Sequence, residues 1–206
     1  MEGSSWKPAN PAPLGLAGFG ITTLVLSMIN AHLVGSPLGS TSVVLGLAIA
    51  YGGLAQLLAG MWEFRAGNTF GAVAFSSYGA FWISFYFLVT NNLVPLVKAG
   101  TAPASVGLYL WAWAIFTGYM FFCSFASSRA VSGVFLALTL TFIFLGIGWS
   151  GSHILTILGG HSSAVKIGGW IGLVTAALAL YTSCAEVMHA QYGRYVLPVG
   201  APKASV

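Results

Sequence analysis

The polar residues that could act on a small solute lie along one side of a predicted first helix. Phe19, Thr23, Ser27 and Asn30 follow one another at intervals of four, four and three residues. Because an α-helix has about 3.6 residues per turn, these intervals place the four side chains on one face. Such a row offers hydroxyl and amide groups without a fixed charge. For each Ser and Thr, a simple hydrogen bond back to its own helix remains an open alternative.

Further uncharged polar residues fall on the first three predicted helices. Gln56 lies in the middle of a long apolar run, where its amide needs protein partners or water. The other polar candidates are Thr22, Asn68, Thr69 and Ser77. We expect all of these side chains to line one polar, uncharged path.

The residues that most enzymes require are missing or badly placed. The chain contains no Asp, no His-Glu-x-x-His motif and no Gly-x-Ser-x-Gly motif, so we expect no enzymatic activity. His32, His153 and His161 lie at or near the ends of predicted helices, where interfacial histidines are more common than metal ligands. We therefore expect neither a metal nor another cofactor.

Two acidic residues lie close to the ends of predicted helices. Glu63 and Glu186 have Arg65 and Arg194 nearby in the sequence, so a solvated or paired carboxylate is the simpler interpretation. The functional alternative is proton exchange, or control of an entrance to the polar path.

The composition shows which elements must position these residues. Of the 206 residues, 57% are hydrophobic and only 5% are charged, which is typical of an integral membrane protein. The apolar stretches are long and continuous, so they predict membrane-spanning helices rather than strands. The six predicted spans are 14–34, 42–62, 70–92, 107–126, 131–151 and 167–189. We expect one all-α transmembrane domain over residues 1–206, with short tails at 1–9 and 195–206.

The basic residues predict how the chain is oriented in the membrane. Six spans place five of them on one side, namely Lys7, Arg65, Arg129, Arg194 and Lys203. Lys98 and Lys166 fall on the other side. By the positive-inside rule, both termini are cytoplasmic. The net charge of +4 thus reflects topology, and we expect no nucleic-acid partner.

Small residues recur at four-residue spacing in two predicted spans. The rows are Gly52, Gln56, Gly60 and Gly168, Gly172, Ala176. Such rows let helices approach closely, either within one subunit or between subunits, and the sequence leaves both uses open. Cys123 and Cys184 lie within predicted spans, where we expect them to be small buried side chains.

The segment before the first span reads as a helix start. Asn10 is a favoured N-cap, Pro11 suits the first helical position, and Pro13 falls in the first turn, where a missing N–H costs no helical bond. Asn-Pro-Ala also occurs in water channels, but there two copies meet at mid-membrane. Here it occurs once, before the span, so we interpret it as a helix end at the membrane surface that favours an anion.

Four stretches together resemble the acetate uptake transporter family. They are NPAPLGLAGFGITT, YGGLAQLLAGMWEFRAGNTFG, AFSSYGAFW, and GWIGL with YGRYVLPVG. Members of that family include bacterial acetate and succinate permeases and fungal acetate and ammonia-export proteins. The resemblance covers almost the whole chain.

The resemblance implies six transmembrane helices per subunit, a hexameric ring in the plasma membrane, and one pore per protomer. It implies that small monocarboxylates, chiefly acetate, are the substrates, with the dicarboxylate succinate in some members. It also implies an apolar constriction, whose matching positions are Phe19, Tyr78 and Leu138. Asn10, Pro11, Pro13 and Glu63 then mark the signature and the entrance.

Three functions remain distinct at this point. The first is a passive anion channel or proton-coupled permease for acetate. The second is an ammonia or ammonium facilitator, in which Tyr78 and Trp82 on one helical face hold a cation by π-interaction. The third is a membrane sensor or assembly protein that transports nothing.

Overall fold

The computed structural model describes residue 6 and residues 8–35, 37–151, 153, 154, 156 and 162–200. Most of the predicted N-terminal tail, Lys7, His161 and Lys203 lie outside these residues. Within them, six helical segments are long and apolar enough to cross a membrane, which confirms the six predicted spans. They are Ala12–Asn30, Ser42–Ala66, Thr69–Lys98, Ala102–Ala126, Arg129–Gly151 and Ser163–Tyr192.

Two of the spans are not continuous α-helices. The second consists of α3 (Ser42–Ile49), a π-helical segment η1 (Ala50–Ala55) and α4 (Gln56–Ala66). The third consists of α5 (Thr69–Phe87), a π-helical segment η2 (Leu88–Asn92) and α6 (Leu93–Lys98). The remaining elements are α1 (Ala12–Asn30), α2 (Pro37–Ser40), α7 (Ala102–Cys123) with a 3-10 turn η3 (Ser124–Ala126), α8 (Arg129–Gly151) and α10 (Ser163–Tyr192).

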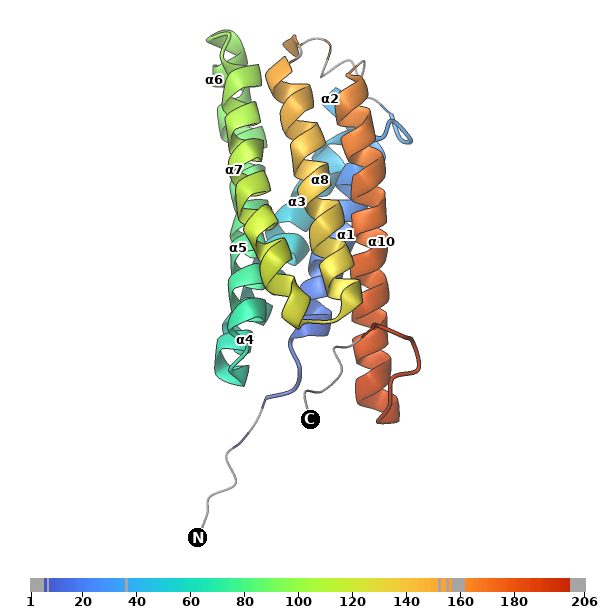
Figure 1. Cartoon of the computed structure of the whole chain (residues 1–206). Coiled ribbons are helices and arrows are strands. Elements are labelled where there is room, and N and C mark those ends of the chain that lie inside the picture. The colour runs from blue at the N-terminus through green and yellow to red at the C-terminus, as the bar shows by residue number, and fades with distance from the viewer. Residues whose placement is uncertain are drawn as a thin grey trace.

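The spans stand side by side in an upright bundle (Figure 1). The helix α1 packs against α10, α10 packs against α8, α8 against α7, and α4 against α5. Arg65, Arg129 and Arg194 fall at the end of the bundle where α1 begins and α10 ends, which we call the arginine end. Lys98 and Lys166 fall at the opposite end, the lysine end.

Glycines from both predicted rows pack against neighbouring helices of the same chain. A Cβ added to Gly60 would lie 2.5 Å from the backbone nitrogen of Ser76, and one added to Gly172 would lie 3.1 Å from the Cβ of Ser27. Only a hydrogen atom fits at such positions. These members of the two rows therefore serve packing within the subunit.

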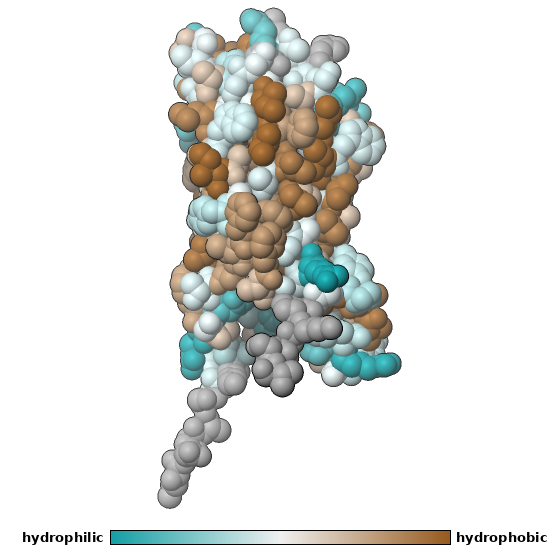
Figure 2. Space-filling view, viewed as in Figure 1, coloured by the Kyte–Doolittle hydropathy of each residue, from teal (hydrophilic) through white to brown (hydrophobic). Residues whose placement is uncertain are grey.

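The outside of the bundle is apolar, which explains one wrong prediction. Figure 2 shows hydrophobic side chains over the middle of the visible face, with polar ones gathered toward the ends. Cys123 and Cys184 are exposed rather than buried. In a membrane protein the outer surface meets lipid, so a small apolar thiol is stable there as well as in the core.

The start of α1 is fastened by hydrogen bonds. The helix begins at Ala12, one residue later than predicted, with Pro11 in the cap position. Asn10 still performs the capping function, because its Oδ1 accepts from the Ala12 N–H at 3.0 Å. The Ser183 hydroxyl of α10 donates to the Pro13 carbonyl at 2.7 Å, so the first turn of α1 is also tied to α10.

The segment that follows α10 returns to the bundle; we call residues 194–200 the C-terminal strap. The carbonyls of Gly200 and Val199 accept from the N–H groups of Arg129 and Ala130, at 2.9 and 3.0 Å. Ser128 Oγ accepts from Val131 N–H at 3.3 Å. The free N–H groups in the first turn of α8 are thus satisfied by the strap and by Ser128.

Candidate functional site: two cavities within the bundle

Two cavities lie among the described residues of the bundle, one toward each end. The lysine-end cavity has a volume of about 320 Å³, and the arginine-end cavity about 130 Å³. Phe19 of α1 and Leu138 of α8 line both. These two side chains, both almost fully buried, therefore form a shared apolar wall between the cavities.

Tyr78 faces the arginine-end cavity beside this wall. Its ring centroid lies 5.6 Å from that of Phe19 and 6.1 Å from that of Phe135. Its hydroxyl is turned to α7, where it shares a hydrogen bond of 2.9 Å with Thr117 Oγ1. Tyr78 consequently presents an aromatic ring rather than a hydroxyl to the cavity.

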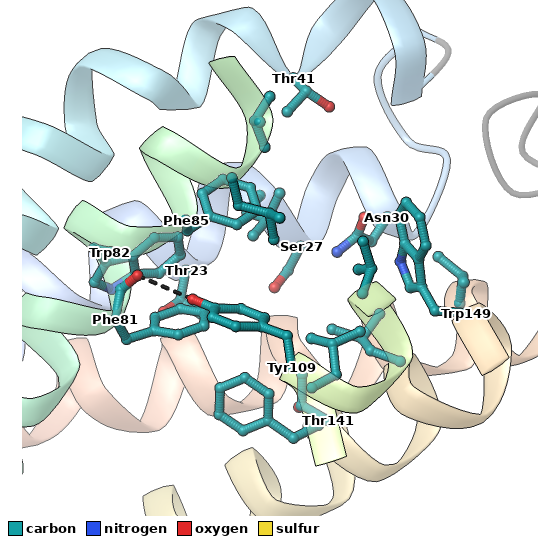
Figure 3. Close-up of a pocket in the computed structure, with 18 of the residues that line it drawn as sticks. Thr23, Ser27, Asn30, Thr41, Phe81, Trp82, Phe85, Tyr109, Thr141 and Trp149 are labelled. Carbon is teal, nitrogen blue, oxygen red and sulfur yellow. Dashed lines mark hydrogen bonds between the residues drawn. The ribbon is translucent and has the colours of Figure 1, made fainter. Parts of the chain in front are cut away.

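The predicted polar face of α1 lines the lysine-end cavity. Thr23, Ser27 and Asn30 all border it, and Phe19 borders it on the side toward the arginine-end cavity. Figure 3 shows Ser27 and Asn30 directed into the space between the helices. Thr23 Oγ1 and Trp82 Nε1 are buried polar atoms without a hydrogen-bond partner in the protein. Buried polar atoms generally have a partner, so these two hydrogen-bonding groups are left unused within the described part of the chain.

Much of the remaining cavity wall consists of residues that no pattern in the sequence had indicated. Tyr109 and Thr141 line the lysine-end cavity together with the aromatic side chains Phe81, Phe85 and Trp149 (Figure 3). Phe142 lines it as well. The Tyr109 hydroxyl donates to the Phe81 carbonyl at 3.2 Å. Periodicity could have found Thr141, because it lies three residues after Leu138 and so on the same face of α8.

The arginine-end cavity has two amide side chains in its lining, Gln56 and Asn68. Gln56 is only 1% exposed, and its Oε1 has no partner in the protein. It is the first residue of α4, directly after η1, so the π-helical segment determines the face on which its side chain lies. Asn68 is the N-cap of α5, since its Oδ1 accepts from the Gly71 N–H at 3.1 Å.

Several predicted path residues lie outside both cavities. Thr22 is fully buried and donates to the Gly18 carbonyl at 2.8 Å, which is the back-bonded arrangement left open above. Thr69 and Ser77 do not border either cavity. Tyr78 and Trp82 border different cavities, so they do not face one common site.

Asn10, one of the predicted entrance residues, belongs to a hydrogen-bonded cluster at the arginine end. Asn10 Nδ2 donates to Glu186 Oε2 at 3.3 Å, and the Tyr195 hydroxyl donates to Glu186 Oε1 at 3.2 Å. Glu186 is thus hydrogen-bonded on both oxygens. His189 stacks on Tyr195 with ring centroids 4.0 Å apart. Partial burial and the Glu186 carboxylate raise the pKa of Tyr195, so the phenol stays protonated and remains a donor.

The cavities are lined without fixed charge. Among the residues that the structure describes, neither lining includes Lys, Arg, Asp or Glu, and no three His, Cys, Asp or Glu side chains cluster as a metal site would require. Six membrane-length helices around two uncharged cavities, joined at one apolar wall, define a membrane transport protein.

The chain belongs to the GPR1/FUN34/yaaH family, because the sequence profile of that family matches residues 2–201. This match confirms the resemblance seen in the sequence. It is 42% identical over 196 residues to the succinate-acetate/proton symporter SatP of Escherichia coli K12, covering 94% of this chain and 96% of that one. The fold is similar to the solved structure of the bacterial acetate channel SatP, with a TM-score of 0.81 and 39% identity, over 94% of this chain and all of that one. A more distant relative is the ammonia transport outward protein 2 of Saccharomyces cerevisiae, 37% identical over 185 residues, covering 88% of this chain and 62% of that one.

Proposed function

We propose that this protein carries small monocarboxylates, chiefly acetate, across the membrane through the two cavities. The observation that carries this proposal is the shared wall of Phe19 and Leu138, with uncharged polar groups on either side of it. A solute that passes this wall moves from one end of the bundle toward the other.

The uncharged lining suits rapid passage of a carboxylate. A carboxylate that leaves water must exchange its hydration for hydrogen-bond donors, and the hydroxyls of Thr23 and Ser27 and the amides of Asn30, Gln56 and Asn68 offer donors of moderate strength. A fixed Lys or Arg at the same depth would hold the anion too tightly for quick release. Several weak sites therefore favour flux over retention.

In this proposal Phe19, Tyr78 and Leu138 form the constriction. Their apolar surfaces exclude water when no solute is present, and their spacing limits the size of acid that passes. Tyr78 contributes because its ring packs on Phe19 at the arginine-end side of the wall.

The orientation and assembly follow from the same proposal. The arginine end carries more basic residues than the lysine end and so faces the cytoplasm, which places both termini there. The protein resides in the plasma membrane as a homo-oligomer, and its family resemblance favours a hexameric ring in which each protomer has its own path.

The decisive experiment is flux of labelled acetate into liposomes that contain the purified protein. The pH gradient and the membrane potential are varied independently, and protein-free liposomes give the leak of undissociated acid. Flux above that leak supports the proposal. Flux that follows potential alone indicates anion conduction, whereas flux that requires inward protons indicates symport. Absence of acetate flux above the leak under every condition would refute the proposed transport of carboxylates.

The aromatic lining of the lysine-end cavity favours one alternative, an ammonia or ammonium facilitator. Phe81, Trp82, Phe85 and Tyr109 present ring surfaces there, and such surfaces attract cations. The same liposomes distinguish the two functions. Alkalinisation of the lumen on addition of ammonium, above that of protein-free liposomes and without any acetate flux, would assign the protein to ammonia instead, because only the neutral base takes up a proton inside.

A further inference from the structure

Glu63 is a buried acid without a basic partner. It is 1% exposed, although it lies near the arginine end of the second span. Among the residues that the structure describes, its Oε1 has no hydrogen-bond partner. A charged carboxylate in such a place loses most of its hydration, and a hydrogen bond with the Asn68 side chain compensates only part of that loss.

No described basic group faces Glu63 from the elements that pack against it. The titratable side chains of α5 are Tyr78 and Tyr86, that of η1 is Tyr51, and α1 has none. Arg65, two residues further along α4, is directed elsewhere: its Nη2 donates to the Trp6 carbonyl at 3.3 Å, and its guanidinium lies 5.5 Å from the Trp6 ring centroid. Within α1, η1 and α5, the groups that can face Glu63 are therefore neutral.

The Glu63 carboxyl adjoins two residues that line the arginine-end cavity, Gly71 and Asn68. A Cβ added to Gly71 would lie 3.0 Å from Glu63 Oε1 and 2.6 Å from Asn68 Nδ2, so the carboxyl and the amide meet against this glycine. Gly71 and Asn68 both line the cavity. The absence of a side chain at Gly71 thus brings the acid close to any solute held there.

Other unpartnered polar atoms lie along the same α4–α5 contact. Gln56 and Glu63 are seven residues apart, two turns along one face of α4, and Gly60 lies between them against Ser76. Gln56 Oε1 and Ser76 Oγ share with Glu63 Oε1 the lack of any partner in the protein. The α4–α5 contact thus holds three hydrogen-bonding atoms that no described group satisfies.

We propose that Glu63 is the proton-binding residue of the transport path, a role that rests on the proposed carboxylate transport. A carboxylate in the arginine-end cavity and an ionised Glu63 would place two negative charges together in a region of low dielectric. Entry of the anion therefore favours uptake of one proton by the Glu63 carboxylate, which becomes the neutral acid. By linkage, protonation of Glu63 strengthens binding of the anion to the same extent.

The test uses exchange of labelled for unlabelled acetate across liposomes at equal pH on both sides, so that no gradient drives it. In the wild type, the exchange rate above the protein-free leak falls about tenfold from mildly acidic to mildly alkaline buffer, the factor that 1.4 kcal/mol of repulsion produces. Glu63→Gln, which stays neutral, retains exchange and loses this pH dependence. Glu63→Asp, which can still bind a proton, restores it.

Glu186→Gln is the matched control, because Glu186 lies at the same end but already has both oxygens hydrogen-bonded. It keeps the pH dependence of the wild type. An unchanged pH dependence in Glu63→Gln would overturn the proposal.

A second measurement does not depend on transport. Infrared difference spectra of the wild type, taken across the same pH range, should show the carbonyl band of a protonated carboxylic acid that disappears as the pH rises. The band persists in Glu186→Gln and is absent in Glu63→Gln. Its presence in a protein that exchanges no acetate would refute the proposed function while retaining the proton site, and its absence from the wild type would refute the proton site itself.

Discussion

The hydroxyl of Tyr78 and Oγ1 of Thr117 lie 2.9 Å apart and share a hydrogen bond between α5 and α7. Both side chains are buried. The bond fixes the direction of the Tyr78 ring, which packs against Phe19 on one side and Phe116 on another, at 5.6 and 5.5 Å between centroids. A residue outside the cavities thereby determines how an aromatic ring borders one of them.

Replacement of Thr117 by Val should destabilise the protein. The change leaves the Tyr78 hydroxyl buried without a partner, at a cost of about 1–3 kcal/mol. Melting of the purified protein in detergent measures the effect. The double variant Thr117→Val with Tyr78→Phe removes both partners, so it should melt at a higher temperature than Thr117→Val alone. A double variant that is less stable than either single variant would show that the bond has no such role.

Removal of a ring from the wall should widen the range of acids that pass. Phe19→Ala or Tyr78→Ala enlarges the space between the two cavities, so longer monocarboxylates and dicarboxylates should enter liposomes faster relative to acetate. Phe122→Ala is the control, because Phe122 is an aromatic of α7 that is 68% exposed on the outside of the bundle. Unchanged selectivity in both wall variants would contradict the constriction.

Truncation of the C-terminal strap should lower the stability of the protein only when Val199 and Gly200 are removed. A chain that ends at Pro198 lacks the carbonyls that accept from Arg129 and Ala130, and it lacks Val199, which is 4% exposed. We expect a loss of about 1–3 kcal/mol, because helix-end N–H groups become unpaired and an apolar contact is lost. A chain that ends at Gly200 keeps both bonds and should melt like the full chain. Equal melting of the two truncated proteins would argue against the strap.

The spans and the polar face of α1 could be predicted because each follows from a simple physical constraint. A membrane requires about 20 apolar residues per helix, so the six runs were visible without any structure. The helix α1 is regular throughout its length, so the spacing of Phe19, Thr23, Ser27 and Asn30 was enough to place them on one face.

The rest of the path depended on local geometry that composition does not reveal. Thr22 and Ser77 each adjoin a residue that lines a cavity, but one step along a helix turns a side chain by about 100° and takes it off that face. Asn68 caps α5 rather than lying within it. The π-helical segments change the direction in which later side chains of the second and third spans point. No residue type in these segments predicts the wider helical turn.

The shared wall of Phe19 and Leu138 has an electrical consequence. On the proposed path, water in the two cavities would conduct whereas the apolar layer would not, so most of the membrane voltage would fall across this one layer rather than across the full ~30 Å of hydrocarbon. An anion that stepped past the two side chains would then cross most of the electric field at once. Each 100 mV contributes up to about 2.3 kcal/mol to that single step.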